Sequence, residues 1–158
     1  MERSLAVLAC TVLALVTAAG VAPSAADDDR RVTVVTRAPF ASVAEALERG
    51  IAEEKMALVC HANAQRGAAA RGVTIRGNQV LMLFRNDLAV RLLAADPAAG
   101  FEAPLRIYVF ENADGTTTVS YIPPEAVFAP YQHPEVQAVA RELAPIVRRI
   151  VDRATGSR

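Results

Sequence analysis

The clearest alternation of hydrophobic and polar positions falls in residues 105–122. Apolar side chains recur at every second position in residues 105–110, and the same period returns in residues 117–122 after Asp114-Gly115. A period of two sends successive side chains to opposite faces of a strand, and Asp-Gly supplies the positive φ angle that a tight reversal needs. The pattern therefore predicts a β-hairpin, one face of which the rest of the chain must cover.

Four other short apolar runs favour β-strands. Residues 32–36 are rich in β-branched side chains, and residues 56–61, 73–75 and 80–84 are apolar runs of strand length. The run 80–84 has no polar alternate, so we expect a central strand that is covered on both faces. Residues 63–72 are mostly small and predict a loop.

A first helix follows the first predicted strand. Ser42 with Glu45 three residues later forms a capping box, and Val43, Leu47 and Ile51 then recur every four residues. This spacing predicts an amphipathic helix that lies on the sheet. We expect its acids, including the pair Glu53-Glu54, to lie on the solvated face.

Two further helices are indicated nearer the C-terminus. Asn86 or Asp87 can cap a short helix that ends before Pro97, because the proline ring disfavours helical geometry in the residue before it. His133-Pro134 opens the last helix, since proline is tolerated at a first helical position. The last helix has an apolar stripe made of Val136, Val139, Leu143, Val147 and Ile150. We expect this stripe to pack on the sheet, and Arg149 only to suit the negative C-terminal end of the helix.

These elements predict one α+β domain over residues 32–154, followed by a short tail at 155–158. Its order is strand, helix, four strands with a short helical insertion, and helix. Such an order gives an antiparallel sheet of about five strands with two main helices on one face.

The N-terminus has the pattern of a secretory signal peptide. Arg3 precedes an apolar run over residues 5–21, and small residues up to Ala26 lead into the charged segment 27–31. We expect cleavage after Ala26, a disordered charged lead at 27–31, and a periplasmic or secreted mature protein. Two alternatives remain open: an uncleaved membrane anchor, and a lipoprotein modified at Cys10, whose preceding apolar region is short.

Charge and cysteine content limit the partners and the chemistry. The chain carries 17 basic and 17 acidic residues, so it lacks the positive excess that nucleic-acid binding needs. Membrane contact is expected only through an uncleaved anchor. Loss of Cys10 with the signal peptide leaves Cys60 as the one cysteine, which must be buried, capped or paired between chains.

A set of dispersed residues between Thr36 and Phe128 resembles the family called domain of unknown function 302 (DUF302). The matching positions are Ala38-Pro39-Phe40, His61-Ala62, Leu83-Phe84 with Asn86, Asp96-Pro97 with Gly100, Pro104-Leu105, Asp114-Gly115, and Ser120-Tyr121 with Pro124. The resemblance implies a TATA-binding-protein-like fold, with some members pairing as homodimers. It implies no activity. Arg85 and Asp87 stand where the family often has Gly and Pro around Asn86, so a family pocket there would differ in this chain.

The adjacent pair Cys60-His61 suggests a metal or nucleophile site. Adjacent strand residues point to opposite faces, so we expect Cys60 to be a small core side chain and His61 to lie at a loop margin. The alternative is a metal site that uses Cys60 with His133, for which Met56 and Met82 could supply soft sulfur ligands.

No catalytic signature is present. Gly67–Gly72 lacks the Gly-Lys-Ser/Thr of a phosphate loop, and neither Ser42 nor Ser120 has a neighbouring base or a nucleophile-elbow sequence. We therefore expect a non-catalytic, exported module without a cofactor that binds a small ligand or a protein, including a second copy of itself. The candidate ligand-binding residues are Cys60, His61, Asn86 and Tyr121. The rival hypothesis is a periplasmic metal- or sulfur-handling protein that uses Cys60.

Overall fold

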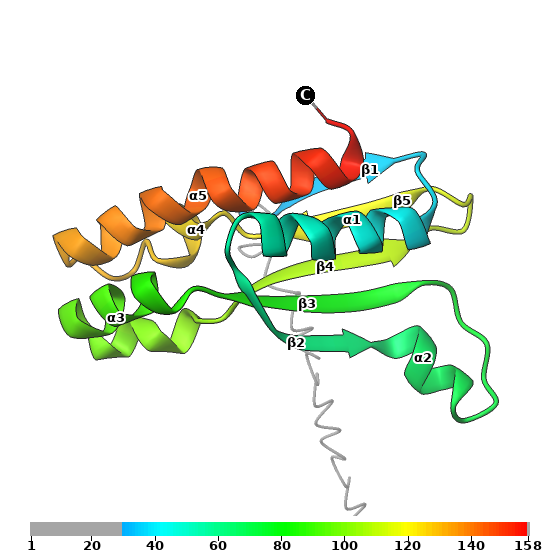
Figure 1. Ribbon diagram of the computed structural model, residues 1–158, viewed down its shortest axis with the longest axis horizontal. Helices are drawn as coiled ribbons and strands as arrows, with labels where there is room; N and C mark the ends of the chain where they lie inside the picture. Colours follow the sequence, from blue (N-terminus) through cyan, green and yellow to red (C-terminus); the bar gives the residue numbers. More distant parts are fainter. Residues whose placement is uncertain (1–29, 158) are drawn as a thin grey trace, which may run out of the picture.

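The computed structural model describes residues 30–157 and contains a five-stranded antiparallel sheet (Figure 1). The strands lie in the order β1-β5-β4-β3-β2, so β1 and β2 form the two edges. The strands are β1 (Val32–Thr36), β2 (Ala57–Asn63), β3 (Asn78–Phe84), β4 (Leu105–Glu111) and β5 (Thr117–Tyr121).

Two long helices lie on one face of this sheet, α1 (Phe40–Glu53) and α5 (Pro134–Thr155), and Figure 1 shows them side by side above the strands. The shorter helices are α2 (Ala64–Ala69), α3 (Asn86–Ala95), the 3-10 helix η2 (Pro97–Glu102) and α4 (Pro124–Val127). The predicted α+β class, with its main helices on one face, is confirmed.

The hydrophobic core fills the layer between the sheet and the helices. Its fully buried side chains include Leu47 and Ile51 from α1, Ile107 from β4, Val119 from β5 and Ile150 from α5. The apolar stripes predicted for the first and last helices are therefore buried as expected. Burial of a large aliphatic side chain contributes about 1.5–3 kcal/mol, so these stripes stabilise the two-layer packing.

Two of the sequence predictions that depend on local signals are confirmed. The hairpin joins β4 to β5, with Gly115 at φ +81° in its turn. His133 is the N-cap of α5, and its Nδ1 atom accepts a hydrogen bond from the amide of Glu135 at 3.2 Å. These features need only neighbouring residues, which is why the sequence indicates them well.

The predicted capping box of the first helix is wrong. The helix begins at Phe40, its N-cap is Pro39, and no side chain caps it. Proline has no amide proton, and the preceding loop is held instead by Thr117, whose hydroxyl donates to the carbonyl of Ala38 at 2.8 Å. This long-range contact moves the start of the helix ahead of Ser42.

The segment between β2 and β3 also differs from expectation. Asn63 caps the helix α2 by accepting a hydrogen bond from the amide of Arg66 at 2.8 Å, where the sequence predicted a loop. Residues 73–75 form no strand, and Val73 and Ile75 are exposed. After α3, residues Pro97–Glu102 form the 3-10 helix η2, which Asp96 caps.

The third strand occupies a different environment from the one predicted. β3 is the fourth strand in the sheet order, and both long helices lie on the same side of it. Leu81 and Leu83 are buried on the helical side, while Val80, Met82 and Phe84 remain half-exposed on the other. The apolar character of this strand therefore extends to a sheet face that the long helices leave open.

The predictions for the N-terminus fall outside the part of the chain that the structure describes. These are the signal peptide at 1–26, its cleavage after Ala26, the role of Cys10 and most of the charged lead. Within residues 30–157, no helix has both the length and the apolar content needed to cross a bilayer.

Candidate functional site

Cys60 lies on the face of the sheet that the long helices leave uncovered, not in the core. In the register of β2 and β3 it stands opposite Met82, after an irregularity at Val59, and its side chain is exposed. The expectation of a buried thiol is therefore wrong. The physical reason is the strand order, which places β2 at an edge where its outer side chains meet no other layer.

His61 points to the opposite, helical side, as the alternation of a strand requires. Its Nε2 atom lies 2.9 Å from Oε1 of the buried Gln79, and its Nδ1 atom lies 3.7 Å from Oε1 of Glu48 on α1. The imidazole thus links the edge strand to its neighbour and to the helix above. The two residues of the Cys60-His61 pair cannot act on one ion from opposite faces.

The other candidate residues lie apart from Cys60 and from each other. Asn86 is the exposed first residue of α3, Tyr121 is buried at the end of β5, and His133 caps α5. Burial is the main cause that raises the pKa of Tyr121. Within residues 30–157 no hydrogen bond joins any two of Cys60, His61, Asn86 and Tyr121, and the structure does not bring them into one site.

The structure also offers no ready metal centre at these positions. Met56, one of the proposed sulfur ligands, is buried on the helical side, and His133 already uses Nδ1 as a helix cap. Among residues 30–157, no three or more His, Cys, Asp and Glu side chains gather so that they could hold a metal ion.

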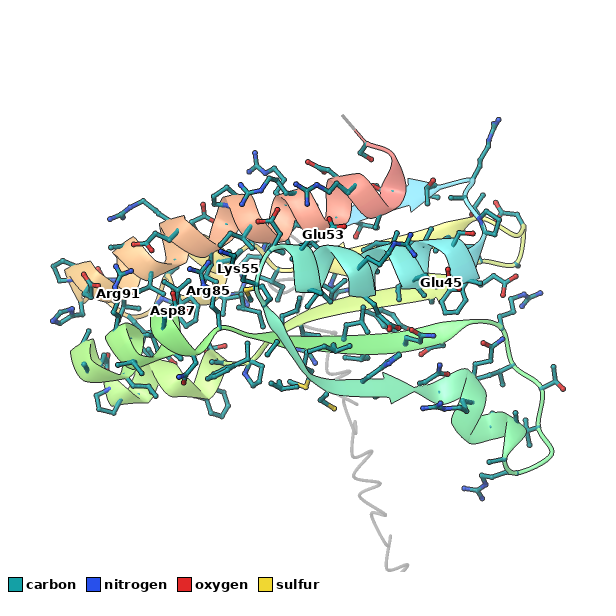
Figure 2. All side chains as sticks on the ribbon, viewed as in Figure 1. Glu45, Glu53, Lys55, Arg85, Asp87 and Arg91 are labelled. Atoms are coloured by element: carbon teal, nitrogen blue, oxygen red, sulfur yellow. The ribbon has the colours of Figure 1, made fainter. Side chains whose placement is uncertain are left out.

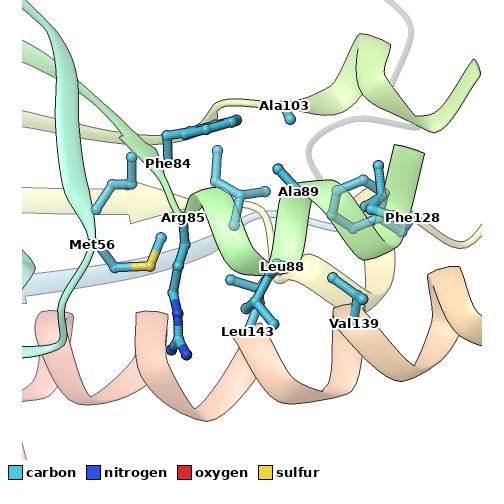
Figure 3. A pocket seen from close by; sticks show the side chains of 12 residues that line it. Met56, Phe84, Arg85, Leu88, Ala89, Ala103, Phe128, Val139 and Leu143 are labelled. Atoms are coloured by element: carbon cyan, nitrogen blue, oxygen red, sulfur yellow. The ribbon is translucent and has the colours of Figure 1, made fainter. Parts of the chain in front are cut away.

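A small apolar cavity lies next to Asn86, between the end of β3, α3 and α5 (Figure 3). Its volume is about 30 Å³, and its walls include Leu88, Phe128 and Leu143. Pockets for drug-sized ligands hold roughly 300–1,000 Å³, whereas a single water occupies about 30 Å³ of liquid. This cavity is a packing gap in the core and not a preformed ligand site.

Charged side chains around the cavity are paired with one another. Arg85 donates two short hydrogen bonds to Asp87, and Arg91 contacts Glu135 and Glu142 on α5, each at 2.7 Å. These bonds raise the pKa of Arg91 and lower the pKa of Glu142. Figure 2 shows Arg85, Asp87 and Arg91 together at this end of the molecule. The two contacts of Arg91 join α3 to α5, whereas the bonds between Arg85 and Asp87 stay within the start of α3.

The face of the sheet that the long helices leave open is an extended surface with few charged side chains. The register places these side chains on it: Thr33, Val35, Ala57, Cys60, Ala62, Asn78, Val80, Met82, Phe84, Arg106, Tyr108, Phe110, Thr118 and Ser120. Arg106 is the single charged residue in this set. A water-facing side of an antiparallel sheet ordinarily carries many charged and polar side chains. This surface, which we call the open face, carries one charge, and its members Thr118 and Ser120 are buried.

An aromatic pair lies at the centre of the open face. The rings of Tyr108 and Phe110 stack with their centroids 5.1 Å apart, and Asn78 donates to the hydroxyl of Tyr108 at 2.5 Å. These contacts hold the rings in fixed positions, which lowers the entropy that a binding partner would have to remove. The sequence alone did not predict this surface, although its signal was the lack of polar residues at alternate positions of 80–84.

Comparisons with known proteins support the fold and assign no activity. The family model "Domain of unknown function DUF302" matches residues 32–154. A crystal structure of an uncharacterized conserved DUF302 protein from Bacillus stearothermophilus superposes with a TM-score of 0.68 at 17% identity. The match covers 79% of this chain and 98% of that one. No curated protein matches.

Proposed function

Because this chain belongs to the DUF302 family, for which the family description gives no activity, we propose a function from the geometry of its surface. The protein is a non-catalytic, exported interaction module, and its open face binds a second copy of the chain. The observation that carries this proposal is the nearly uncharged, aromatic open face on a sheet whose long helices all lie on the other side.

The size of the open face suits a dimer interface. Five strands at about 4.8 Å spacing and about six residues at 3.4 Å rise give a face of about 24 by 20 Å. Two such faces together cover about 960 Å² in projection, and side-chain relief adds to that area. A specific interface must clear about 1,000 Å², so pairing through the whole face reaches the lower limit for a specific contact.

The composition of the open face also suits a copy of itself. Interface centres are rich in aromatic side chains and methionine and poor in charge, which describes Tyr108, Phe110 and Met82. A strongly charged partner would meet almost no charges of opposite sign on the open face. The 30 Å³ cavity beside α3 is, by contrast, too small for a drug-sized ligand.

The oligomeric state of the purified protein tests this proposal. We expect a dimer by light scattering coupled to size exclusion, and Val80→Lys should convert it to a monomer by placing a charge at the centre of the face. The control is Phe101→Lys, because Phe101 is 88% exposed on η2, outside the strands that make up the open face, and its replacement should leave the dimer intact. A wild-type monomer at all concentrations, with both variants folded by circular dichroism, would refute the dimer.

Export is a separate part of the proposal and has its own measurement. Expression of the full chain in a bacterial host should give a protein that begins at or near Asp27, because Ala26 ends the small-residue cleavage context. Mass spectrometry of the product reads the N-terminus directly. An intact N-terminus on membrane-bound material would instead favour the uncleaved anchor.

One observation favours the rival function in sulfur or metal handling. The thiol of Cys60 is exposed, and Met82 stands opposite it in the ladder, so two soft sulfur side chains share one part of the open face. Mass spectrometry of protein taken directly from cells would reveal a persulfide or metal adduct. The Cys60→Ser protein should then lose the adduct while it keeps its stability and its dimer.

A further inference from the structure

The most basic segment of the chain is also one that projects from the fold. No Asp or Glu occurs between Glu54 and Asp87, and this stretch contains Arg66, Arg71 and Arg76. These three arginines lie on residues 64–77, which comprise α2 and the connection to β3 and which we call the basic arm. Figure 1 shows the basic arm beyond the end of the sheet opposite to α3.

The two ends of the basic arm are fixed, and residues 74–76 line a hollow with Phe110 and Glu111 of β4. Asn63 caps α2 at one end, and at the other the amide of Gly77 donates to the carboxylate of Glu111 at 3.1 Å. Between them the backbone bonds mainly to itself, as in the 3.0 Å bond from the amide of Val73 to the carbonyl of Ala68. These hydrogen bonds give the backbone of the basic arm a defined conformation.

Apolar side chains lie between the arginines of the basic arm. Val73 is 53% exposed and Ile75 is 39% exposed, and both stand between Arg71 and Arg76. The salt bridges among the described residues involve none of the three arginines of the arm. The surface thus combines available positive charge with exposed β-branched side chains.

We infer that the basic arm binds the surface of an anionic lipid bilayer. Acidic headgroups attract arginine side chains, whose apolar stems lie along the interface while Val73 and Ile75 enter the boundary of the acyl chains. A nucleic acid or an acidic protein would use the charge and leave the apolar pair in water, so a lipid surface is the partner that uses both features. This contact uses residues other than those of the open face, although Ile75 and Arg76 line one hollow with Asn78 and Phe110.

The absence of tryptophan allows a direct test on the full chain. The sequence contains no Trp, so Val73→Trp places a single reporter on the arm, and Phe101→Trp places a matched reporter on η2. Each protein is mixed with vesicles of phosphatidylcholine alone, or of equal parts phosphatidylcholine and phosphatidylglycerol. We expect a blue shift of the emission only for Val73→Trp and only with the anionic vesicles, because that reporter enters the acyl boundary.

The arginines can be tested in the same assay. Replacing Arg66, Arg71 and Arg76 by Gln in the Val73→Trp protein should weaken binding on the order of 100-fold, since each cationic side chain near an anionic surface contributes about fivefold. Ile75→Ser should weaken it further without changing its salt dependence. These results would support the lipid contact whether or not Val80→Lys abolishes a dimer.

Other outcomes would overturn the inference. No shift at Val73→Trp, or the same shift at Phe101→Trp, would show that the basic arm does not enter the lipid interface. An equal shift with soluble polyglutamate would assign the arm to an acidic protein surface instead. An emission shift of equal size with neutral vesicles would show that the arginines do not contribute to the binding.

Discussion

Arg149 donates two hydrogen bonds to the carboxylate of Glu54, from Nε to Oε1 at 2.9 Å and from Nη2 to Oε2 at 2.6 Å. Arg153 adds a contact of 3.2 Å to the same carboxylate. The side chain of Glu54 is only 12% exposed, so the prediction that it lies on a solvated face is wrong. The Glu54–Arg149 pair joins the C-terminal end of α1 to α5 and fixes the position of one helix along the other.

Loss of this pair should destabilise the protein by more than a surface ion pair does. Arg149→Ala removes a bidentate bond and leaves a nearly buried carboxylate with less compensation, so we expect a cost of about 1–2 kcal/mol in the free energy of unfolding. Arg141→Ala is the control, because Arg141 is exposed on the same helix and has no ion pair in the described chain. Urea unfolding measures both. Equal costs would mean that the pair contributes nothing.

The same pair should make stability depend on pH. The bond from Arg149 is the largest cause that lowers the pKa of Glu54 below its ordinary value of 4.5. A carboxyl with a lower pKa in the folded state stabilises the fold fully above its unfolded pKa, and that contribution disappears as the pH falls through the folded value. The stability gap between wild type and Arg149→Ala should therefore be present at pH 7 and shrink at about pH 3.

The control for this pH dependence is again Arg141→Ala. Other carboxyls with lowered pKa, such as Asp87 and Glu142, remain in every variant and cancel in the comparison. The small gap between wild type and Arg141→Ala should stay constant from pH 7 to about pH 3. A gap for Arg149→Ala that also stayed constant would contradict the link to Glu54.

Leu143 should be among the most sensitive positions of α5. It is buried and lines the cavity beside Leu88 and Phe128, so Leu143→Ala enlarges a gap that already exists. We expect a cost of about 2–5 kcal/mol, as for typical core truncations. Arg141→Ala, on the exposed side of the same helix, should cost much less in the same urea titration. Near-zero costs for both would mean that α5 does not dock on the sheet.

Gly77 should tolerate no side chain because the ring of Phe40 covers its Cα. A Cβ atom at Gly77 would overlap the ring carbons of Phe40 near their attachment to α1. Gly77→Ala should therefore destabilise the protein by about 1–3 kcal/mol through overpacking. The measurement is the midpoint of thermal or urea unfolding.

A glycine in open space provides the matched control for that experiment. Gly67 lies within α2 with nothing within 4 Å of an added Cβ, so Gly67→Ala should be neutral or stabilise the helix by up to about 1 kcal/mol. The double variant Phe40→Ala with Gly77→Ala should cost less than the sum of the single changes, since Phe40→Ala removes the ring that the new Cβ atom at residue 77 would overlap. Additive costs would place the strain elsewhere.

Several parts of the fold followed from the sequence by itself. The alternation in residues 105–122 with Asp114-Gly115 indicated the hairpin, and His133-Pro134 marked the start of α5. The four-residue spacing of Leu47 and its neighbours indicated which side of α1 is buried. These signals are local, because backbone geometry and the side chains of one or two turns are enough to produce them.

Other features were decided only by the tertiary structure. Alternation says that a strand has two faces, but the strand order decides which face is covered, and so Cys60 is exposed on β2 while Val80 and Met82 face outward on β3. The pairing of Glu54 with Arg149 joins residues 95 positions apart, which no local pattern can indicate. The open face and the basic arm exist because long-range strand pairing places some apolar and basic side chains where no other layer meets them.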